Sequence, residues 1–138
     1  MTRLHSSEAR VLIVEDEFLL ALQLEDILED GGHVVAATLP DSRSLAKLSE
    51  APDIALVDLN LRDGLTGPDV ARQLSERYGI PVIYVTANPA QIGDPAATAV
   101  GVVQKPFTRE AILGAIEFGL HHEGAHRPAG LEAIRSAA

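Results

Sequence analysis

The sequence predicts an α/β fold in which a doubly wound, five-stranded parallel sheet lies between two layers of helices. Short runs rich in β-branched residues alternate with segments of helical periodicity, a pattern typical of successive strand–helix–strand units. The run IALV at 54–57 is apolar throughout, as strands buried on both faces of a sheet are. Four of the apolar runs are followed directly by polar residues, as expected where parallel strands end at a ligand-binding edge.

The strands are located by these apolar runs and by the turn residues around them. Gly79 and Pro81 separate a helical segment from the fourth run, and a proline fits best at the first residue of a strand. The predicted strands are Arg10–Val14, His33–Ala37, Ile54–Val57, a strand opening at Pro81 and ending at Thr86, and Val100–Val103.

The helices are located by apolar periodicity and by their start and stop signals. Gly31 and Gly79 are typical stops, Asp41 is a typical cap, and Pro106 is typical of a first turn. The predicted helices are Phe18 to about Asp30, a helix capped by Asp41 that runs to about Ser49, Pro68 to about Tyr78, and Pro106 to about His121. The stretch NPAQIGDPAATA at 88–99 has two prolines and a glycine, so a fourth helix there should be short, broken or replaced by a loop.

Residues 10–121 are therefore expected to form one domain between an N-terminal tail, 1–9, and a flexible C-terminal tail, 122–138, which is rich in Gly, Pro and Ala. The 11 basic and 20 acidic side chains give a net charge of -9, which argues against nucleic acid or an anionic membrane as partners. No cysteine is present, and no apolar run approaches membrane-spanning length. These features favour a soluble, cytoplasmic protein.

Five polar side chains follow four of the apolar runs: Glu15 and Asp16, Asp58, Thr86 and Lys105. Because the carboxyl ends of parallel strands meet at one edge of the sheet, we expect these side chains to share a crevice. Clustered carboxylates repel each other and favour a bound cation, and oxygen ligands suit Mg²⁺ or Ca²⁺. The ammonium and the hydroxyl indicate that an anion, most simply a phosphoryl group, binds beside the cation.

Asp58 follows the middle strand, where its carboxylate could attack phosphorus in line to give an aspartyl phosphate. Phosphoryl transfer depends mainly on positioning and on charge neutralisation. Mg²⁺ held by Asp16, by Glu15 and by Asp58 itself would supply the neutralisation. The side chain of Asn60 is expected to point to the same side, with its backbone carbonyl near the metal.

Lys105 and Thr86 complete the expected site, because an ammonium can pair with phosphoryl oxygens and a hydroxyl can donate a hydrogen bond to one of them. Each residue also has a purely structural interpretation. The acidic run at 15–17 could cap a helix, Asp58 could cap a turn, Thr86 could simply end a strand, and Lys105 could simply precede a helix. The joint occurrence of all five at one predicted edge favours the phospho-acceptor hypothesis.

With the motifs VLIVEDE, LVDLNLRDGLTG, VIYVTA and QKPF in this order, the sequence from Arg10 to about Leu120 resembles the receiver domain of two-component response regulators. The resemblance implies a flavodoxin-like sheet of strand order 2-1-3-4-5. It implies that Asp58 takes a phosphoryl group from a histidine kinase or histidine phosphotransfer protein, and that Glu15, Asp16 and the backbone carbonyl of Asn60 bind Mg²⁺. It further implies a cis peptide bond before Pro106.

The resemblance also implies that the domain is no enzyme beyond self-catalysed phosphoryl transfer to Asp58 and slow autodephosphorylation, with Thr86 and Lys105 sensing the phosphoryl group. Two departures affect its output. Val102 stands where many receivers have a Tyr or Phe that turns inward with the Thr, and the stretch Asn88–Ala99 replaces a regular fourth helix. A similar shortened region occurs in receivers of general-stress-response regulators that sequester anti-sigma factors.

No output domain follows the last predicted helix, so we expect a stand-alone receiver, monomeric or weakly dimeric, that signals to an unknown downstream protein. Alternatives are a phosphate sink, a degenerate receiver that acts only as an interaction module, a metal-dependent aspartyl phosphatase and a flavodoxin-like nucleotide-binding module. A phosphatase of the haloacid dehalogenase type would want its nucleophile on the first strand and a second Asp two residues later, where Asn60 stands. The histidines at 121, 122 and 126 are better explained by a helix end and a solvated tail than by a metal site.

Overall fold

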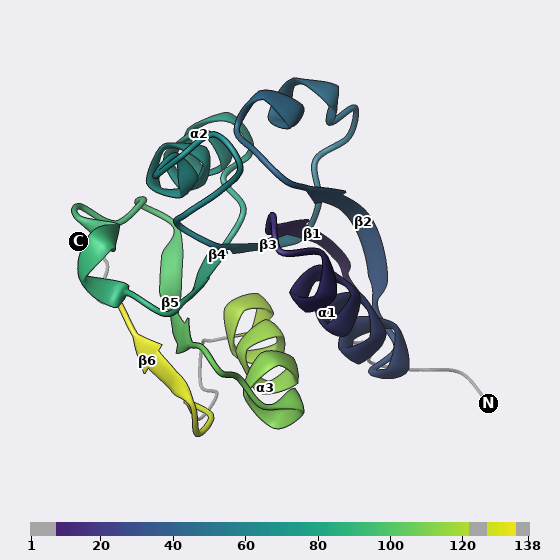
Figure 1. Cartoon of the computed structure of the whole chain (residues 1–138). Coiled ribbons are helices and arrows are strands. Elements are labelled where there is room, and N and C mark those ends of the chain that lie inside the picture. Colours follow the sequence, from purple (N-terminus) through teal and green to yellow (C-terminus); the bar gives the residue numbers. More distant parts are fainter. Residues whose placement is uncertain (1–7, 122–126, 135–138) are drawn as a thin grey trace.

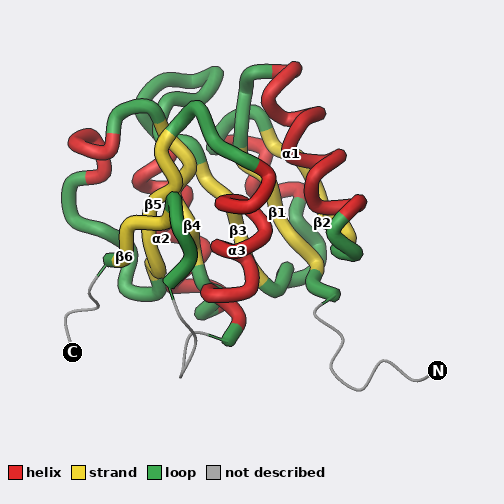
Figure 2. Tube along the Cα trace, turned by 90° about the horizontal axis from the view of Figure 1, so that it is seen from below, coloured by secondary structure: helices red, strands yellow, loops and turns green. Residues whose placement is uncertain are grey.

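The computed structural model describes residues 8–121 and 127–134. Its sheet has six strands in the order β2-β1-β3-β4-β5-β6, with α1 and α3 on one face and α2 on the other (Figures 1 and 2). The strands are β1 Arg10–Val14, β2 Val34–Leu39, β3 Ile54–Val57, β4 Val82–Thr86, β5 Ala99–Gln104 and β6 Leu131–Ala133. The helices are α1 Phe18–Asp30, α2 Gly67–Tyr78 and α3 Arg109–Leu120, with short 3₁₀ helices η1 Arg43–Lys47 and η2 Pro89–Ile92.

The sheet has two hydrophobic cores because successive side chains of a strand point to opposite faces. Leu12 and Val14 of β1 lie in the core beneath α2, together with Leu74. Val11 and Ile13 lie in the core beneath α1 and α3. The middle strand β3 is fully buried, as the apolar run at 54–57 predicts. The predicted three-layer architecture and the order of the first five strands are thereby confirmed.

The prediction of exactly five parallel strands is wrong. A sixth strand, β6, pairs antiparallel with β5, with Val103 opposite Leu131 and Gly101 opposite Ala133. The composition suggested a flexible tail, but the Leu131 side chain is buried in the core beneath α3. Gly101 permits the close approach of β6, because a Cβ atom there would lie 2.7 Å from the backbone oxygen of Glu132. The remaining tail residues 122–126 and 135–138 lie outside the described part of the chain.

Two predicted helices differ from those observed. The helix predicted from Asp41 to about Ser49 is only the 3₁₀ helix η1, whose one buried residue is Leu45. A single apolar anchor does not form the stripe that supports a longer amphipathic helix. Asp41 still accepts a hydrogen bond from the backbone N–H of Ser44, at 2.9 Å. The last helix starts at Arg109 rather than at Pro106, since Thr108 caps it by accepting a hydrogen bond from the backbone N–H of Ala111.

The other local predictions agree with the structure more closely. α1 ends at Asp30 before the two glycines, and α2 ends at Tyr78, directly before Gly79, whose φ of 64° is left-handed. The stretch after β4 contains only η2, as its prolines and glycine predict. The bond between Lys105 and Pro106 is cis. At the end of the predicted N-terminal tail, the buried Ala9 accepts a hydrogen bond from the backbone N–H of Val34, at 2.9 Å. Residues 1–7 of that tail lie outside the described chain.

Candidate functional site

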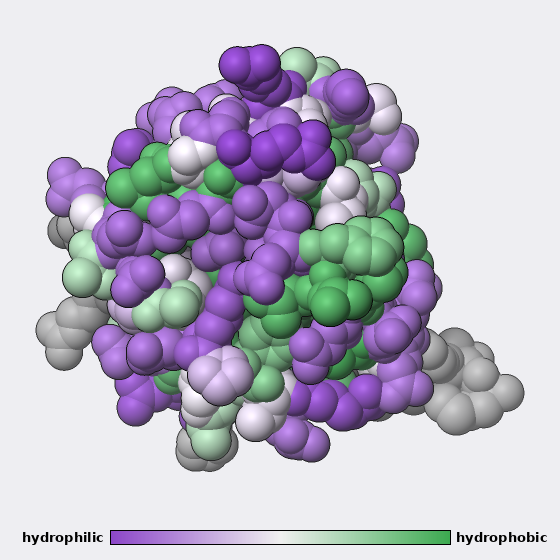
Figure 3. Space-filling model, viewed as in Figure 1, coloured by the Kyte–Doolittle hydropathy of each residue, from purple (hydrophilic) through white to green (hydrophobic). Residues whose placement is uncertain are grey.

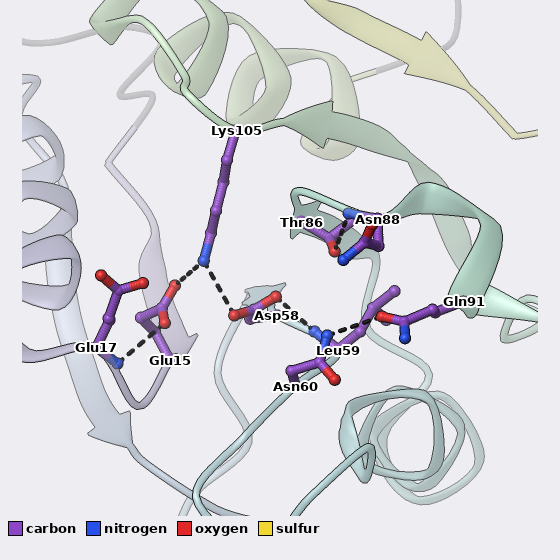
Figure 4. A network of polar contacts seen from close by, with 9 residues as sticks. All are labelled: Glu15, Glu17, Asp58, Leu59, Asn60, Thr86, Asn88, Gln91 and Lys105. Atoms are coloured by element: carbon purple, nitrogen blue, oxygen red, sulfur yellow. Dashed lines mark hydrogen bonds and ion pairs between the residues drawn. The ribbon is translucent and has the colours of Figure 1, made fainter.

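Four parallel strands bring the predicted site residues to one edge of the sheet. Glu15, Asp58 and Lys105 come directly after β1, β3 and β5, and Thr86 is the last residue of β4. Neighbouring strands are in register there, since the backbone N–H of Asp58 donates to the oxygen of Val14, at 2.9 Å, and that of Lys105 donates to the oxygen of Thr86, also at 2.9 Å. The strand ends therefore place these side chains beside one another, as Figure 4 shows.

Lys105 joins the two buried carboxylates of the site. Its Nζ lies 2.8 Å from Oε1 of Glu15 and 3.0 Å from Oδ2 of Asp58 (Figure 4). Backbone groups hold the other oxygens. The N–H of Glu17 donates to Oε2 of Glu15 at 3.1 Å, and that of Leu59 donates to Oδ1 of Asp58 at 2.7 Å. Each carboxylate is thus oriented by one backbone donor and one ammonium.

The electrostatics of the site follow from burial and from these contacts. Burial raises the pKa of Glu15, since removing a carboxylate from water penalises its charged form, and the hydrogen bond from Lys105 only partly opposes this. Burial alone would lower the pKa of Lys105, but its hydrogen bonds to Glu15 and Asp58 raise the pKa above its usual value. Lys105 therefore stays protonated and provides a fixed positive charge beside the carboxylates of Glu15 and Asp58.

Asp16 is the exposed member of an acidic cluster. One carboxylate oxygen each from Glu15, Asp16 and Asp58 lie within 4.8 Å of one another. Glu15 and Asp58 are buried, and Asp16 faces solvent at the rim. Carboxylate oxygens alone make up this donor set, which fits a hard divalent cation such as Mg²⁺ better than a softer metal. The sequence predicted these three residues as metal ligands, and the structure brings all three together.

Thr86 and Asn60 make contacts that the sequence did not predict. Thr86 is completely buried, and its hydroxyl oxygen accepts a hydrogen bond from the backbone N–H of Asn88 at 3.0 Å. The side chain of Asn60 donates through Nδ2 to Oε1 of Gln91 in η2, at 2.8 Å (Figure 4). Neither Asn88 nor Gln91 was predicted as a site residue, because no strand end or motif marks them. Their position depends on how the irregular stretch folds back.

Residues 11–117 match the family model of the response regulator receiver domain, and the chain belongs to this family. It is thus a receiver domain of the two-component response regulator type, as the resemblance of its motifs indicated. Its curated relatives include the phyllosphere-induced regulator PhyR of Methylorubrum extorquens, 33% identical over 122 residues that make up 85% of this chain and 45% of that protein. They also include the sensory transduction protein RegX3 of Mycobacterium tuberculosis, 36% identical over 83% of this chain and 52% of that protein. The chain therefore spans about half the length of these relatives.

Solved structures show the same fold. The receiver domain of the Erythrobacter litoralis PhyR response regulator is 33% identical, with a TM-score of 0.73 over 86% of this chain and 95% of that one. The anti-anti-sigma factor PhyR from Bartonella quintana is 28% identical, with a TM-score of 0.68 over 82% of this chain and 47% of that one.

Proposed function

We propose that the domain is a phospho-acceptor, in which Asp58 takes a phosphoryl group from a phosphohistidine donor protein. The observation that supports this most directly is the contact of Lys105 Nζ with Asp58 Oδ2, at 3.0 Å, within a cluster of three carboxylates. An oxygen of Asp58 would form the new P–O bond while the P–N bond of the donor breaks, and the electron pair leaves with the imidazole, which takes up a proton. Lys105 would then pair with the phosphoryl oxygens.

Mg²⁺ fits the site because its ligands would all be oxygens and two of the three carboxylates are already fixed by backbone hydrogen bonds. Glu15, Asp16 and Asp58 would hold the ion with the backbone carbonyl of Asn60. When bound, the ion would neutralise charge on the transferring phosphoryl group. In this proposal Thr86 donates its hydroxyl proton to a phosphoryl oxygen, and the domain performs no chemistry beyond its own phosphorylation and slow dephosphorylation.

The decisive experiment is an intact mass after incubation with Mg²⁺ and a small acyl-phosphate donor. We expect one base-labile phosphoryl adduct in the wild-type protein and none in Asp58→Asn. Asp26→Asn is the matched control, since Asp26 is an exposed carboxylate of α1 outside the cluster, and it should be modified like the wild type. The absence of an adduct on the wild-type protein with every donor would refute the proposal, and rapid turnover of a small phosphate ester would favour the phosphatase instead.

An exposed hydrophobic patch next to the site supports a protein as the phosphodonor. Phe18 is 72% exposed, Leu19 75% and Leu22 40%, and the first of them follows the acidic run at 15–17 directly. Figure 3 shows hydrophobic residues gathered over α1 on this face. Contiguous exposed apolar surface is typical of a protein interface. A donor bound on this patch would bring its phosphohistidine close to Asp58.

This assignment predicts that protein and small-molecule donors respond differently to the same change. The double variant Phe18→Ala, Leu19→Ala should slow phosphotransfer by about tenfold or more, since buried aromatic anchors often contribute 2 kcal/mol or more to binding. The protein donor for this measurement is chosen from a panel of purified, pre-phosphorylated histidine phosphotransfer proteins as the one that phosphorylates the wild-type chain fastest. Phosphorylation by the small acyl phosphate should be unchanged. Val34→Ala, at another exposed apolar residue, serves as the control.

A further inference from the structure

The stretch between β4 and the end of η2 is held to the acceptor site by only a few contacts. It starts from Thr86, which is fully buried, and ends at Ile92, which is 8% exposed. Of the five residues between them, 87–91, four are exposed and only Pro89 is partly buried. Residues 87–91 therefore form a surface segment between two buried residues, Thr86 and Ile92.

Two hydrogen bonds hold this segment in place, and both partners on the other side belong to the site. The backbone N–H of Asn88 donates to Oγ1 of Thr86 at 3.0 Å. Oε1 of Gln91 accepts from Nδ2 of Asn60 at 2.8 Å, and Asn60 lies two residues after Asp58 (Figure 4). The second bond joins segments 31 positions apart in the sequence. Any rearrangement of the loop after Asp58 must therefore break it or carry η2 along.

The surroundings of the segment leave it room to move. A pocket of about 420 Å³ is lined by Pro89, by Val102 and Gln104 of β5, and by Arg127 and Glu132 of the C-terminal segment. Just after η2, Gly93 has a φ of 66°, in a conformation that residues with a side chain rarely adopt and that glycine adopts freely. Between its buried ends at Thr86 and Ile92, the position of the segment therefore depends largely on the two hydrogen bonds.

We propose that Gln91 is a positioning residue whose hydrogen bond to Asn60 holds the η2 segment in its unphosphorylated position and is lost when Asp58 carries a phosphoryl group. This inference rests on the proposed function of Asp58 and adds how the signal leaves the site. A ligand shifts an equilibrium only by its differential affinity for the two forms. Removal of the hydrogen bond between Gln91 and Asn60, which exists only in the unphosphorylated form, must therefore favour the phosphorylated form. It must also tighten the binding of any ligand that prefers the phosphorylated form.

The test uses a fluorescent reporter on η2. The chain has no cysteine, so Ala90→Cys, at an exposed position in η2, can be labelled with an environment-sensitive dye at a single site. Beryllofluoride with Mg²⁺ serves as the phosphoryl mimic. Gln91→Met keeps the length of the side chain but removes its acceptor oxygen. The matched control is Gln73→Met, which removes an exposed side-chain hydrogen bond of the same length, 2.8 Å to Asp69 on α2.

We expect beryllofluoride to change the fluorescence of the labelled protein, and Gln91→Met to lower its half-saturating concentration by about two- to tenfold, as the net strength of one hydrogen bond predicts. Gln73→Met should leave that concentration unchanged. Three results would overturn the proposal: no fluorescence change although Asp58 forms its phosphoryl adduct, an unchanged midpoint in Gln91→Met, or an equal shift in Gln73→Met. Failure of the wild-type protein to form any adduct would instead refute the proposed function.

Discussion

Lys105 shows how one side chain sets the charge state of the site. Two buried carboxylates so close together would repel each other, and one would take up a proton if no cation were near. The ammonium bridges Glu15 at 2.8 Å and Asp58 at 3.0 Å, and it is itself mostly shielded from water. It therefore offsets the repulsion between the two carboxylates. Together with the backbone N–H of Leu59, the same contact orients the carboxylate of Asp58.

His33 is a buried titratable residue outside the site. Its Nδ1 accepts a hydrogen bond from the backbone N–H of Ala9 at 3.1 Å, so that nitrogen has no proton in the native state. Burial lowers the pKa of His33, although the negative charges of Glu117 and Glu8 oppose the shift. Protonation would remove the acceptor for Ala9 and place a charge in the core.

We predict that His33 makes the fold less stable in mild acid. The pKa of His33 is lower in the folded than in the unfolded chain, so the unfolded chain binds more protons between the two pKa values. In that range the free energy of unfolding decreases as the pH is lowered. The loss should begin as the pH falls through about 6.5, the usual histidine value, and should be complete below the pKa of the folded state. Urea unfolding of wild type and His33→Asn between about pH 8 and about pH 5 measures this. An equal pH dependence in both proteins would contradict the prediction.

The C-terminal segment that contains β6 packs against β5 and α3. Three backbone pairings join β6 to β5, and the backbone N–H of Ile134 donates to the oxygen of Val100 at 2.9 Å. A Cβ atom at Gly114 of α3 would lie 2.7 Å from the side chain of Pro128. Glycines on two different elements thus leave the space that the segment fills. β6 covers the edge of β5, which would otherwise offer unpaired backbone groups.

This arrangement predicts that Leu131 contributes to the stability of the whole domain. Leu131→Ala should lower the free energy of unfolding by about 2–4 kcal/mol, since it removes a buried side chain from the core beneath α3. Glu132→Ala, at the exposed neighbouring position, should change it by about 0.5 kcal/mol or less. Urea unfolding of both variants measures the difference. Equal, small effects would indicate that β6 only lies on the surface.

The molecule as a whole carries a net charge of -9, and three of its carboxylates gather at one edge of the sheet. A divalent cation that binds the folded chain alone stabilises it by mass action. None of the helices in the described residues is both long and apolar enough to cross a membrane. Within the part of the chain that the structure describes, Glu15, Asp16 and Asp58 form a group that could hold a metal ion.

We expect Mg²⁺ at ten times its dissociation constant to raise the free energy of unfolding by about 1.4 kcal/mol. Urea unfolding at increasing MgCl₂, with NaCl added to keep the ionic strength equal, separates specific binding from screening. Asp16→Asn should abolish most of the gain, because it removes a ligand at the rim without disturbing the buried carboxylates. Asp26→Asn should keep it. A gain of the same size in Asp16→Asn would place the ion elsewhere.

The parallel sheet and the side chains that meet at its edge could be predicted from local patterns, since the apolar runs specify buried strands and parallel strands bring their carboxyl ends together. The order of the first five strands was instead an implication of the resemblance to receiver domains. Asp58 and Lys105 lie 47 positions apart, and the sequence predicted that they share a crevice, whereas their direct hydrogen bond is seen only in the structure.

The contacts that hold the segments without such a pattern are visible in the structure and not in the sequence. β6 could not be predicted because its stability comes from the burial of one leucine and from space that glycines leave on β5 and α3. The contact of Gln91 with Asn60 likewise depends on how an irregular stretch folds back over the site. Both are long-range contacts made by short segments, and the hydrophobic periodicity of the sequence does not predict where such short segments pack.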